Sequence, residues 1–489
     1  MGTEVEAKKD ERSPNVILFL IDDLSWADLS LTGSKFYETP NIDRLAAEGG
    51  FFDNAYAANP VCSPTRASVL TGKYPSRLGI SNHSGSRGPK GPKYMLTAPE
   101  VEAAIPHSDT TLAEALKSQG YATAHIGKWH LAKHTAKDRS DYPEKHGFDL
   151  NIAGHKMGQP GSFYFPYKSK KHPSTNVPDL EDGQDGDYLT DVLTRKAIEF
   201  IEAKQDEPFF LNLWYYTVHT PIIPKKEKLK KYQNKLKKMG MTSKAVGVPV
   251  KQSISRAQQN SPAYACMVES MDENIGRIID RVKELGLEDD TLVVFLSDNG
   301  GLSTGAGPNA PTSSFPLRAG KAWVYEGGIR SPLIVKLPGK VKPGVVHHEP
   351  AVSTDVYPTV LELAGIDLLP KQHLDGVSLA GLLGGTMKEL EREAIYIHYP
   401  HYHHINSMGP AGAVRVGDYK LVEIYETGEL ELYNLSKDLG EEENLAKQMP
   451  ELSAKMAKML DQWRKETKSA MPTKTQGYRE GNDWRRKKK

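Results

Sequence analysis

The chain has 489 residues, and its 63 lysines and arginines nearly balance its 62 aspartates and glutamates, for a formal net charge of +1 at pH 7. This balance gives no strong overall field and argues against nucleic acid as the main partner. Hydrophobic residues make up 38% and charged residues 26%, as in ordinary soluble proteins. No apolar run is long enough for a membrane span, and two cysteines are too few for a disulfide framework.

The first segment, residues 1–13, is polar and charged and lacks the apolar core that a signal peptide needs. Two interpretations fit this segment. We expect a periplasmic or secreted protein whose signal peptide is absent from this sequence. A cytoplasmic location is the alternative.

Strand patterns alternate with helical patterns over the next part of the chain. Short continuous apolar runs, typical of strands covered on both faces, occur at 15–22, 209–215 and 291–297. Helical patterns occur between them, at 41–49, 110–120, 188–203 and 263–285. This alternation predicts an α/β fold with a large, mostly parallel or mixed sheet flanked by helices. We assign residues 14–385 to this domain.

Acidic residues follow two of the predicted strands. Asp22 and Asp23 end the first run, while Asp298 and Asn299 follow the run at 291–297. Ligands bind beyond the carboxyl ends of strands in open α/β sheets. Adjacent carboxylates repel each other, and a bound cation would relieve that cost. Oxygen ligands favour Ca²⁺ or Mg²⁺ over zinc, although each acidic pair taken singly is more simply a cap or turn former.

The run Cys62–Gly72 (Cys-Ser-Pro-Thr-Arg-Ala-Ser-Val-Leu-Thr-Gly) indicates a reactive residue at the entrance of a helix. Pro64 suits a first helical position, and Ser63 can cap it. The amino-terminal end of a helix stabilises an anion through unpaired N–H groups and the helix dipole, and Arg66 adds a permanent positive charge. The alternative is a small apolar cysteine in a core helix.

Lysine and histidine side chains follow further strand-like segments. Gly127–His130 (Gly-Lys-Trp-His) comes after a predicted strand at 121–126, and alternation would send Lys128 and His130 to the same side. A lysine beside a histidine suits an anion, and a histidine can also move a proton. His219 follows another predicted strand. The alternative for such isolated residues is a snorkelling lysine and structural histidines.

After residue 385 the pattern changes to short strands separated by turns. Strands are predicted at 394–399, 411–416, 419–425 and 430–435, and an amphipathic helix at 450–467. We assign residues 386–475 to a smaller α+β subdomain with an antiparallel sheet, and residues 476–489 to a polar tail that ends in a solvated basic run.

Two segments bear on the substrate. His398–His404 (His-Tyr-Pro-His-Tyr-His-His) offers groups that can stack on and hydrogen-bond to a sugar ring, and His398, His401 and His403 are the candidate binding residues. The alternative is a histidine-rich surface loop. The stretch 225–238 holds eight lysines and could attract a polyanionic glycan, although a solvated helix is favoured.

Five of these blocks, in chain order, resemble the signatures of the formylglycine-dependent sulfatases of the alkaline phosphatase superfamily. The Cys62 run matches Cys-x-Pro-Ser/Thr-Arg followed by Leu-Thr-Gly, and Gly127–His130 matches a second signature. His219 matches a histidine ahead of a small residue and proline, and Lys321 matches a lysine ahead of Glu-Gly-Gly-Ile-Arg. The acidic pairs match the metal site. Five ordered blocks are far more specific than any one of them.

The resemblance implies a sulfuric ester hydrolase in which a formylglycine-generating or sulfatase-maturating enzyme oxidises Cys62 to formylglycine. The hydrate of that group attacks sulfur, and Asp298 takes its proton. The same resemblance implies one divalent metal bound by Asp22, Asp23, Cys62, Asp298 and Asn299. The oxygen-rich ligand set favours Ca²⁺ over Mg²⁺. With Cys62 modified, no intramolecular disulfide is expected.

Further roles are implied by the same resemblance. Lys128 and Lys321 hold the sulfate oxygens, and Arg66 steadies the hydrate. His219 protonates the departing oxygen, and His130 helps to deprotonate the remaining hydroxyl.

We expect the substrate to be a sulfated carbohydrate, in preference to a steroid or lipid. Two alternatives are kept open. One is a phosphonate or phosphodiester hydrolase of the same superfamily. The other is a non-catalytic binding protein for sulfated glycans, if Cys62 is not modified.

Overall fold

The main sheet of this computed structural model has eight strands in the order β12-β2-β11-β10-β1-β7-β5-β6. The structure describes residues 13–86, 88–133, 138–305, 310–404 and 408–479. The strands of the main sheet are β1 Asn15–Ile21, β2 Gly50–Phe52, β5 Ala122–Gly127, β6 Leu150–Ile152, β7 Phe209–Trp214, β10 Thr291–Ser297, β11 Leu333–Lys336 and β12 Val345–His347.

The sheet is mixed, with a parallel centre. β1 pairs in parallel with β10 on one side and β7 on the other, and β5 pairs in parallel with β7 and β6. β11 is antiparallel to both of its neighbours, β10 and β2. In register, Ile21 of β1 lies opposite Ser297 of β10, while Trp214 of β7 lies opposite Gly127 of β5. The central strands therefore end at one edge, and the residues that follow them emerge close together.

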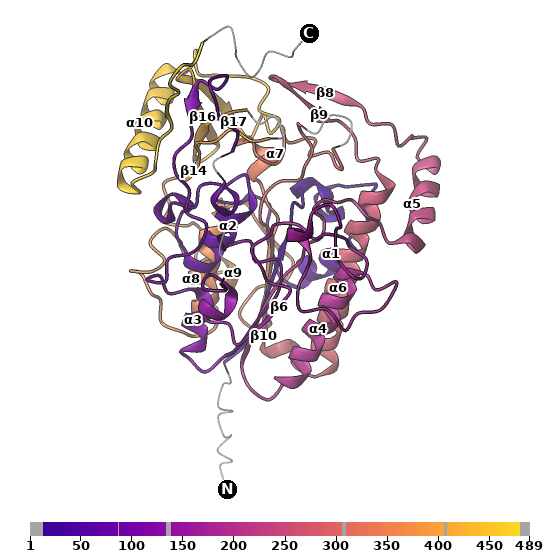
Figure 1. Ribbon diagram of the computed structural model, residues 1–489. Helices are drawn as coiled ribbons and strands as arrows, with labels where there is room; N and C mark the ends of the chain where they lie inside the picture. The colour runs from indigo at the N-terminus through magenta and orange to yellow at the C-terminus, as the bar shows by residue number, and fades with distance from the viewer. Residues whose placement is uncertain (1–12, 87, 134–137, 306–309, 405–407, 480–489) are drawn as a thin grey trace.

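Helices cover both faces of this sheet (Figure 1). On one face lie α1 Pro40–Glu48, α4 Leu189–Ala203 and α6 Pro262–Glu284. On the other lie α2 Cys62–Thr71, α3 Leu112–Lys117, α8 Val356–Leu363 and α9 Ala380–Gly384. Alternate side chains of β1 enter the two cores: Ile17, Phe19 and Ile21 pack in the first, and Val16, Leu18 and Leu20 in the second. Burial on both faces explains why β1 reads as a continuous apolar run.

The carboxy-terminal part forms a separate four-stranded antiparallel sheet. Its strands are β14 Ile395–Tyr399, β15 Ala411–Val416, β16 Tyr419–Ile424 and β17 Glu429–Asn434, and they are followed by α10 Pro450–Glu466. This confirms the predicted α/β class with a smaller antiparallel sheet. A third core joins this sheet and α10 to residues of the 319–329 segment, so the boundary at residue 385 stays a prediction.

Shorter elements complete the chain. They are α5 Lys226–Lys238, α7 Glu326–Ile329, β3 Ala55–Tyr56, β4 Leu96–Thr97, β8 Gly247–Val250, β9 Ser253–Arg256, β13 Ala351–Val352 and β18 Thr473–Lys474. Short 3-10 helices include His83–Gly85, which lies beside the candidate site. Among the described residues, no helix combines the length and the apolar character that a membrane crossing requires.

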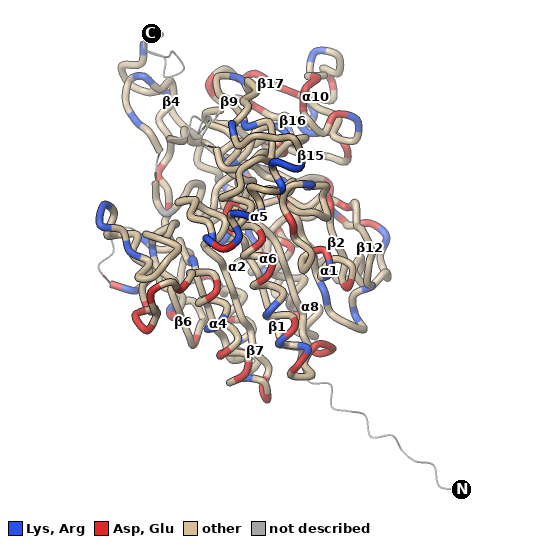
Figure 2. Tube along the Cα trace, turned by 90° about the vertical axis from the view of Figure 1, so that its right-hand side faces the viewer, with Lys and Arg blue, Asp and Glu red and all other residues tan. Residues whose placement is uncertain are grey.

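The lysine-rich stretch forms a surface helix, and several of its lysines have acidic partners. Lys228 lies 2.5 Å from Glu273, Lys231 lies 2.5 Å from Glu269, and Lys235 lies 2.7 Å from Glu38. Figure 2 shows basic and acidic positions intermixed around α5. These pairs favour the solvated helix over the polyanion site. The basic run predicted at the end of the tail, residues 485–489, lies outside the described residues.

Candidate active site

The carboxylates of the two consecutive residues that follow β1 lie close together at the edge of the sheet. Neighbouring residues of a strand point to opposite faces, yet ligand oxygens of Asp22 and Asp23 lie within 4.8 Å of each other. Asp23 has φ +59°, a left-handed conformation that aspartate adopts more readily than most residues. This turn ends the strand alternation and brings both carboxylates to the sheet edge.

The residues after β10 join this pair. The Asp298 N–H donates to the Ile21 carbonyl at 3.1 Å, which continues the β1–β10 pairing, and Asp298 Oδ1 accepts from the Asp23 N–H at 3.1 Å. Asn299 Nδ2 donates to Asp23 Oδ1 at 2.8 Å. Asn299 Oδ1 is buried and has no hydrogen-bond partner among the described groups. A buried amide oxygen without a donor, beside three carboxylates, is a donor set that fits a hard divalent cation.

Three basic side chains balance the three carboxylates. Lys128 Nζ lies 2.7 and 2.8 Å from the two oxygens of Asp22. Lys321 Nζ lies 2.6 and 2.8 Å from those of Asp23.

Arg66 is the third basic group. Its Nη2 lies 2.6 Å from Asp298 Oδ2, and its guanidinium stacks over the Trp214 ring at 5.0 Å. With all three carboxylates ionised, the three basic groups balance their charge, and a cation would compete with the ammonium groups of Lys128 and Lys321 for carboxylate oxygens.

The two carboxylates of β1 differ in acidity. Burial, with the nearby charges of Asp298 and Asp23, raises the pKa of Asp22 to about 8 despite the contact with Lys128. Burial opposes ionisation of Asp23 too, but Lys321 and His219 outweigh it and hold the pKa of Asp23 below its usual range. Positive charge is therefore most needed at Asp22.

Cys62 is the first residue of α2 and faces this cluster. Its Sγ lies 3.4 Å from Lys321 Nζ, and its ligand atom lies within 4.8 Å of those of Asp22, Asp23 and His219. Burial raises the pKa of the thiol to about 11, so the unmodified side chain is a protonated thiol at neutral pH and a poor nucleophile.

The start of α2 differs from the prediction. Val61 is the N-cap residue, and Pro64 is the third helical residue instead of the first. Ser63 does not cap the helix, since its hydroxyl donates to the His130 carbonyl at 2.7 Å. The cap prediction was wrong because the helix begins at Cys62 itself, which places that side chain directly at the amino-terminal end of the helix.

His219 has a defined tautomer when neutral. Its Nδ1 lies 2.8 Å from the Thr220 carbonyl oxygen, which can only accept, so Nδ1 carries the proton. Its Nε2 faces Asp23 Oδ2 at 3.5 Å. Burial and the positive charge of Lys321 lower the pKa of His219 to about 3. Nε2 carries a proton that it can donate only when added negative charge in the site stabilises the imidazolium.

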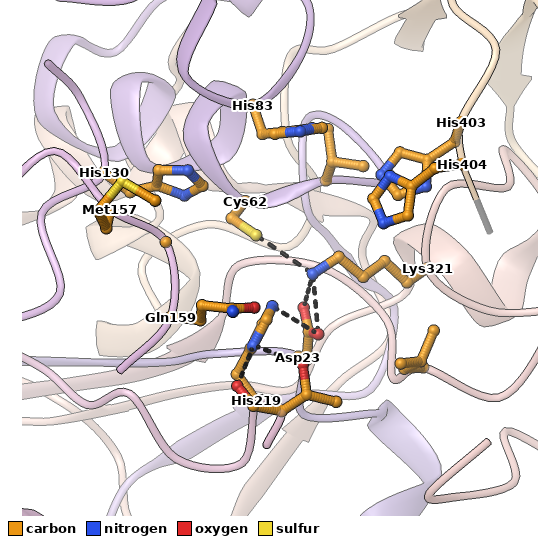
Figure 3. Close-up of a pocket in the computed structure, with 14 residues that line it drawn as sticks. Asp23, Cys62, His83, His130, Met157, Gln159, His219, Lys321, His403 and His404 are labelled. Atoms are coloured by element: carbon orange, nitrogen blue, oxygen red, sulfur yellow. Dashed lines mark hydrogen bonds and ion pairs between the residues drawn. The ribbon is translucent and has the colours of Figure 1, made fainter. Parts of the chain in front are cut away.

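A cavity of about 310 Å³ opens onto this cluster (Figure 3). Six of the predicted site residues line it: Asp23, Cys62, His130, His219, Lys321 and His403. The others of the acidic and basic cluster lie behind this layer and are fully buried: Asp22, Arg66, Lys128, Asp298 and Asn299. Arg66 therefore holds Asp298 in place and does not face the cavity.

The reason given for pairing Lys128 with His130 was wrong. β5 ends at Gly127, so strand alternation does not apply beyond it. Gly127 has φ +105°, and a Cβ there would lie 2.0 Å from the Trp214 carbonyl oxygen, so only glycine fits. His130 has φ +59°. After this bend, Lys128 reaches back to Asp22 while His130 faces the cavity.

Two of the three predicted sugar-binding histidines do not line the cavity. His398 lies within β14, where its ring nitrogens contact the Tyr425 hydroxyl at 2.8 Å and the Ala470 carbonyl at 3.1 Å. His401 Nε2 contacts the Ser81 hydroxyl at 2.8 Å. Both are buried. Composition alone could not tell which members of the cluster face inward, because that depends on where β14 ends.

The structure adds cavity residues that the sequence analysis missed, above all His83 and His404. The ring of His83 lies 5.4 Å from that of His403 and 6.2 Å from that of His404, and the rings of His403 and His404 are 4.1 Å apart. We call these three residues the histidine rim. Figure 3 shows them across the cavity from Gln159 and His219. His83 belongs to no motif, and only the fold brings it here.

Comparisons with known proteins show which proteins this chain is similar to. A family model described as Sulfatase matches residues 14–366, and one described as N-sulphoglucosamine sulphohydrolase, C-terminal, matches residues 319–466. A protein of Formosa agariphila named Sulfatase is 32% identical, with 94% of this chain and 90% of that protein covered. N-acetylgalactosamine-6-sulfatase of Mus musculus is 32% identical, with 77% of this chain and 67% of that protein covered. The crystal structure of Ps i-CgsB in complex with k-i-k-neocarrahexaose has a TM-score of 0.73 and 28% identity, covering 92% of this chain and 93% of that chain.

Proposed function

Because the chain belongs to the sulfatase family and is a sulfuric ester hydrolase, we propose that it removes sulfate from a sulfated carbohydrate with a nucleophile made from Cys62. The observation that carries this proposal is the position of Cys62. It stands at the amino-terminal end of a buried helix, opens onto the cavity, and lies 3.4 Å from the ammonium group of Lys321. Helix dipole and ammonium group both favour an anion there.

The proposed metal is Ca²⁺. Asp22, Asp23, Asp298 and the unpartnered Oδ1 of Asn299 would hold it, since these oxygens suit a hard cation with many oxygen ligands. When bound, such a cation lowers the pKa of a coordinated hydroxyl and neutralises charge on sulfate oxygens.

The nucleophile requires modification of Cys62. Formylglycine, formed from this cysteine by a formylglycine-generating or sulfatase-maturating enzyme, would supply an aldehyde hydrate whose hydroxyl attacks sulfur. The buried, protonated thiol is a poor nucleophile by itself. The phosphodiesterase alternative uses the same geometry, whereas the binding-protein alternative requires an unmodified Cys62.

The chain's own residues then bind the sulfate and move the protons. Lys321, at the cavity wall, and Lys128 behind it supply positive charge to the sulfate oxygens. The anionic sulfate favours the imidazolium form of His219, whose Nε2 donates a proton to the departing sugar oxygen. His130, on the other side of the cavity, is the proposed base for the step that expels sulfate.

The histidine rim is the proposed contact with the sugar. His83, His403 and His404 offer ring faces and nitrogen atoms at the cavity wall, where a pyranose can stack and hydrogen-bond. The relatives support a carbohydrate: one is named an N-acetylgalactosamine-6-sulfatase, and one structure holds a neocarrahexaose. A periplasmic or secreted location, where polymeric glycans are met, is also proposed.

The test is the turnover by matured protein of four substrate types: sulfated galactose or galactosamine oligosaccharides, a nitrophenyl sulfate, a steroid sulfate and a nitrophenyl phosphodiester. Release of inorganic sulfate measures the three sulfate esters, and release of nitrophenol measures the phosphodiester. We expect the sulfated oligosaccharides to give the highest kcat/KM, because contacts away from sulfur contribute to turnover. A higher value on the phosphodiester would overturn the sulfatase assignment of this site, and a higher value on the steroid sulfate would overturn the carbohydrate proposal.

A further inference from the structure

The segment that carries Lys321 packs against the carboxy-terminal sheet. Ala319, Ala322, Trp323, Val324, Tyr325 and Ile329 belong to the third core, together with side chains of β14 to β17 and α10. None of them belongs to the two cores that hold the main sheet between its helices. The third core also holds Tyr56, Val61 and Tyr74. The position of Lys321 therefore depends in part on the carboxy-terminal sheet, although its partner Asp23 follows β1 of the main sheet.

Backbone contacts link this segment to the turn after β10. The Lys321 N–H donates to the Gly301 carbonyl at 2.9 Å, and the Gly300 N–H donates to the Gly328 carbonyl at 2.9 Å. The approach is so close that a Cβ on Gly300 would lie 1.8 Å from the Gly327 carbonyl oxygen. A shift of the segment would therefore move Lys321 and the Asp298–Asn299 turn together.

A buried ion network anchors the same segment at α7. Glu326, the first residue of α7, accepts from Lys420 Nζ of β16 at 3.0 Å. Lys420 Nζ also lies 2.8 Å from Glu441 Oε1, and Glu441 Oε2 accepts from the Glu326 N–H at 2.7 Å. The side chains of Lys420, Glu326 and Glu441 are at most 2% exposed.

Three more groups complete the network around Glu326. Its second oxygen accepts from the Tyr56 hydroxyl at 2.8 Å and from Arg330 Nη1 at 3.1 Å. Arg415 of β15 contacts the same Tyr56 hydroxyl. Burial disfavours the Glu326 carboxylate, but Lys420, Arg330 and Arg415 outweigh it and lower its pKa to about 2. Glu326 therefore stays ionised, and each of its two carboxylate oxygens contacts a basic side chain.

We propose that the Glu326–Lys420–Glu441 network positions Lys321 for sulfate binding, and that Lys420 and Glu326 are positioning residues for the reaction. A buried ion pair adds little net stability compared with apolar residues of the same size, but it fixes geometry through directional contacts. Here it joins the first residue of α7, five positions after Lys321, to β16. The inference rests on the proposed role of Lys321 in binding sulfate.

The test compares Lys420→Met with Arg464→Met in the full-length protein. Arg464 also forms an ion pair in the carboxy-terminal part, 2.7 Å from Glu423, which is partly exposed; its charged and aromatic partners among the described residues are Glu423, Asp461 and Tyr425, outside α7 and the Lys321 segment. The readouts are the dissociation constant of inorganic sulfate by calorimetry, kcat and KM on a nitrophenyl sulfate, and the thermal midpoint.

We expect Lys420→Met to weaken sulfate binding about tenfold and to lower kcat/KM by up to about 100-fold, since misplacing a positioned group by about 1 Å can cost that much. Arg464→Met should lower the thermal midpoint but leave sulfate binding unchanged. If both variants bind sulfate like the wild type, or lose affinity equally, the positioning role is refuted.

Two further variants keep the inference separate from the proposed function. Lys321→Ala must weaken sulfate binding; if it does not, the proposed role of Lys321 fails, whatever Lys420→Met does. If Lys420→Met does not fold, Glu441→Gln decides with the same readouts. It keeps the size of the side chain and removes one of the two carboxyl groups that contact Lys420. Sulfate affinity equal to that of the wild type in Glu441→Gln would then refute the inference.

Discussion

Replacing Lys321 with methionine should make the stability of the protein much more dependent on a divalent cation. In the wild type, Lys321 Nζ contacts both oxygens of Asp23, at 2.6 and 2.8 Å, so Asp23 keeps a positive partner when no metal is bound. In Lys321→Met, only the metal can supply that charge. A buried charge whose partner has been removed costs about 3–5 kcal/mol, and the remaining contacts of Asp23 with His219 and Asn299 favour the lower end.

The size of the effect can be converted to a thermal shift. At about 2.1 cal/mol/K per residue, a chain of 489 residues unfolds with an entropy near 1 kcal/mol/K. The extra loss on chelation is therefore about 3–5 °C. In the wild type, removing a cation present at about 100 times its Kd costs about 2.7 kcal/mol, or roughly 3 °C.

The assay is differential scanning calorimetry of both proteins with Ca²⁺ and after chelation. Lys336→Met is the control, because Lys336 is buried and lies 2.7 Å from Glu48 and 2.8 Å from Glu288, away from the site. It should lower the midpoint equally with and without the cation. If Lys321→Met and the wild type lose the same number of degrees on chelation, the reasoning that Lys321 and the metal compensate the same carboxylate is refuted.

Four further predictions concern catalysis and stability. Cys62→Ala should abolish turnover while the calorimetric midpoint stays within a few degrees, and near-normal turnover would exclude this nucleophile. His219→Gln should lower kcat by about 10²–10⁴ on a sulfated sugar but little on a nitrophenyl sulfate, whose leaving group needs no proton; equal losses would remove the acid role. Burial and the neighbouring Glu326 raise the pKa of Glu441 from 4.5 to about 7. The folded state therefore holds this proton more tightly than the unfolded state, and the stability that the proton contributes falls as pH rises from about 4.5 to 7. The thermal midpoint should depend less on pH over this range in Glu441→Gln than in the wild type, and the same pH dependence in both would contradict the assignment. Replacing His403 and His404 with alanine should lower kcat/KM on a sulfated oligosaccharide far more than on a nitrophenyl sulfate, and similar losses on both would show that the histidine rim does not hold the sugar.

Several of the metal and sulfate residues could be predicted because they follow strands whose pattern is clear. β1, β7 and β10 are continuous apolar runs, and a parallel sheet brings their carboxyl ends to one edge. Asp22, His219 and Asp298 were placed correctly at strand ends for this reason. The motifs then added Cys62 and Lys321, which no strand pattern predicts.

The rest depended on contacts between distant segments. The sequence predicts repulsion between the adjacent carboxylates, but no pattern in it shows that Lys128, Lys321 and Arg66 each pair with one carboxylate of the cluster. His83 enters the cavity from a short 3-10 helix without a motif.

The short strands were also missed. β2 and β11 have only three and four residues. This is too few residues for the alternation of apolar and polar side chains to identify a strand. They complete the sheet beside β10 through pairing that only the three-dimensional structure reveals.

The measurement that tests the central claim most directly is tandem mass spectrometry of the peptide containing Cys62, taken from protein whose sulfate-releasing turnover has been measured. We predict that position 62 carries an aldehyde in place of the thiol, and that kcat per molecule rises in proportion to the aldehyde fraction across preparations made with and without a maturating enzyme. Full sulfatase activity in a preparation whose position 62 is entirely unmodified cysteine would contradict the account.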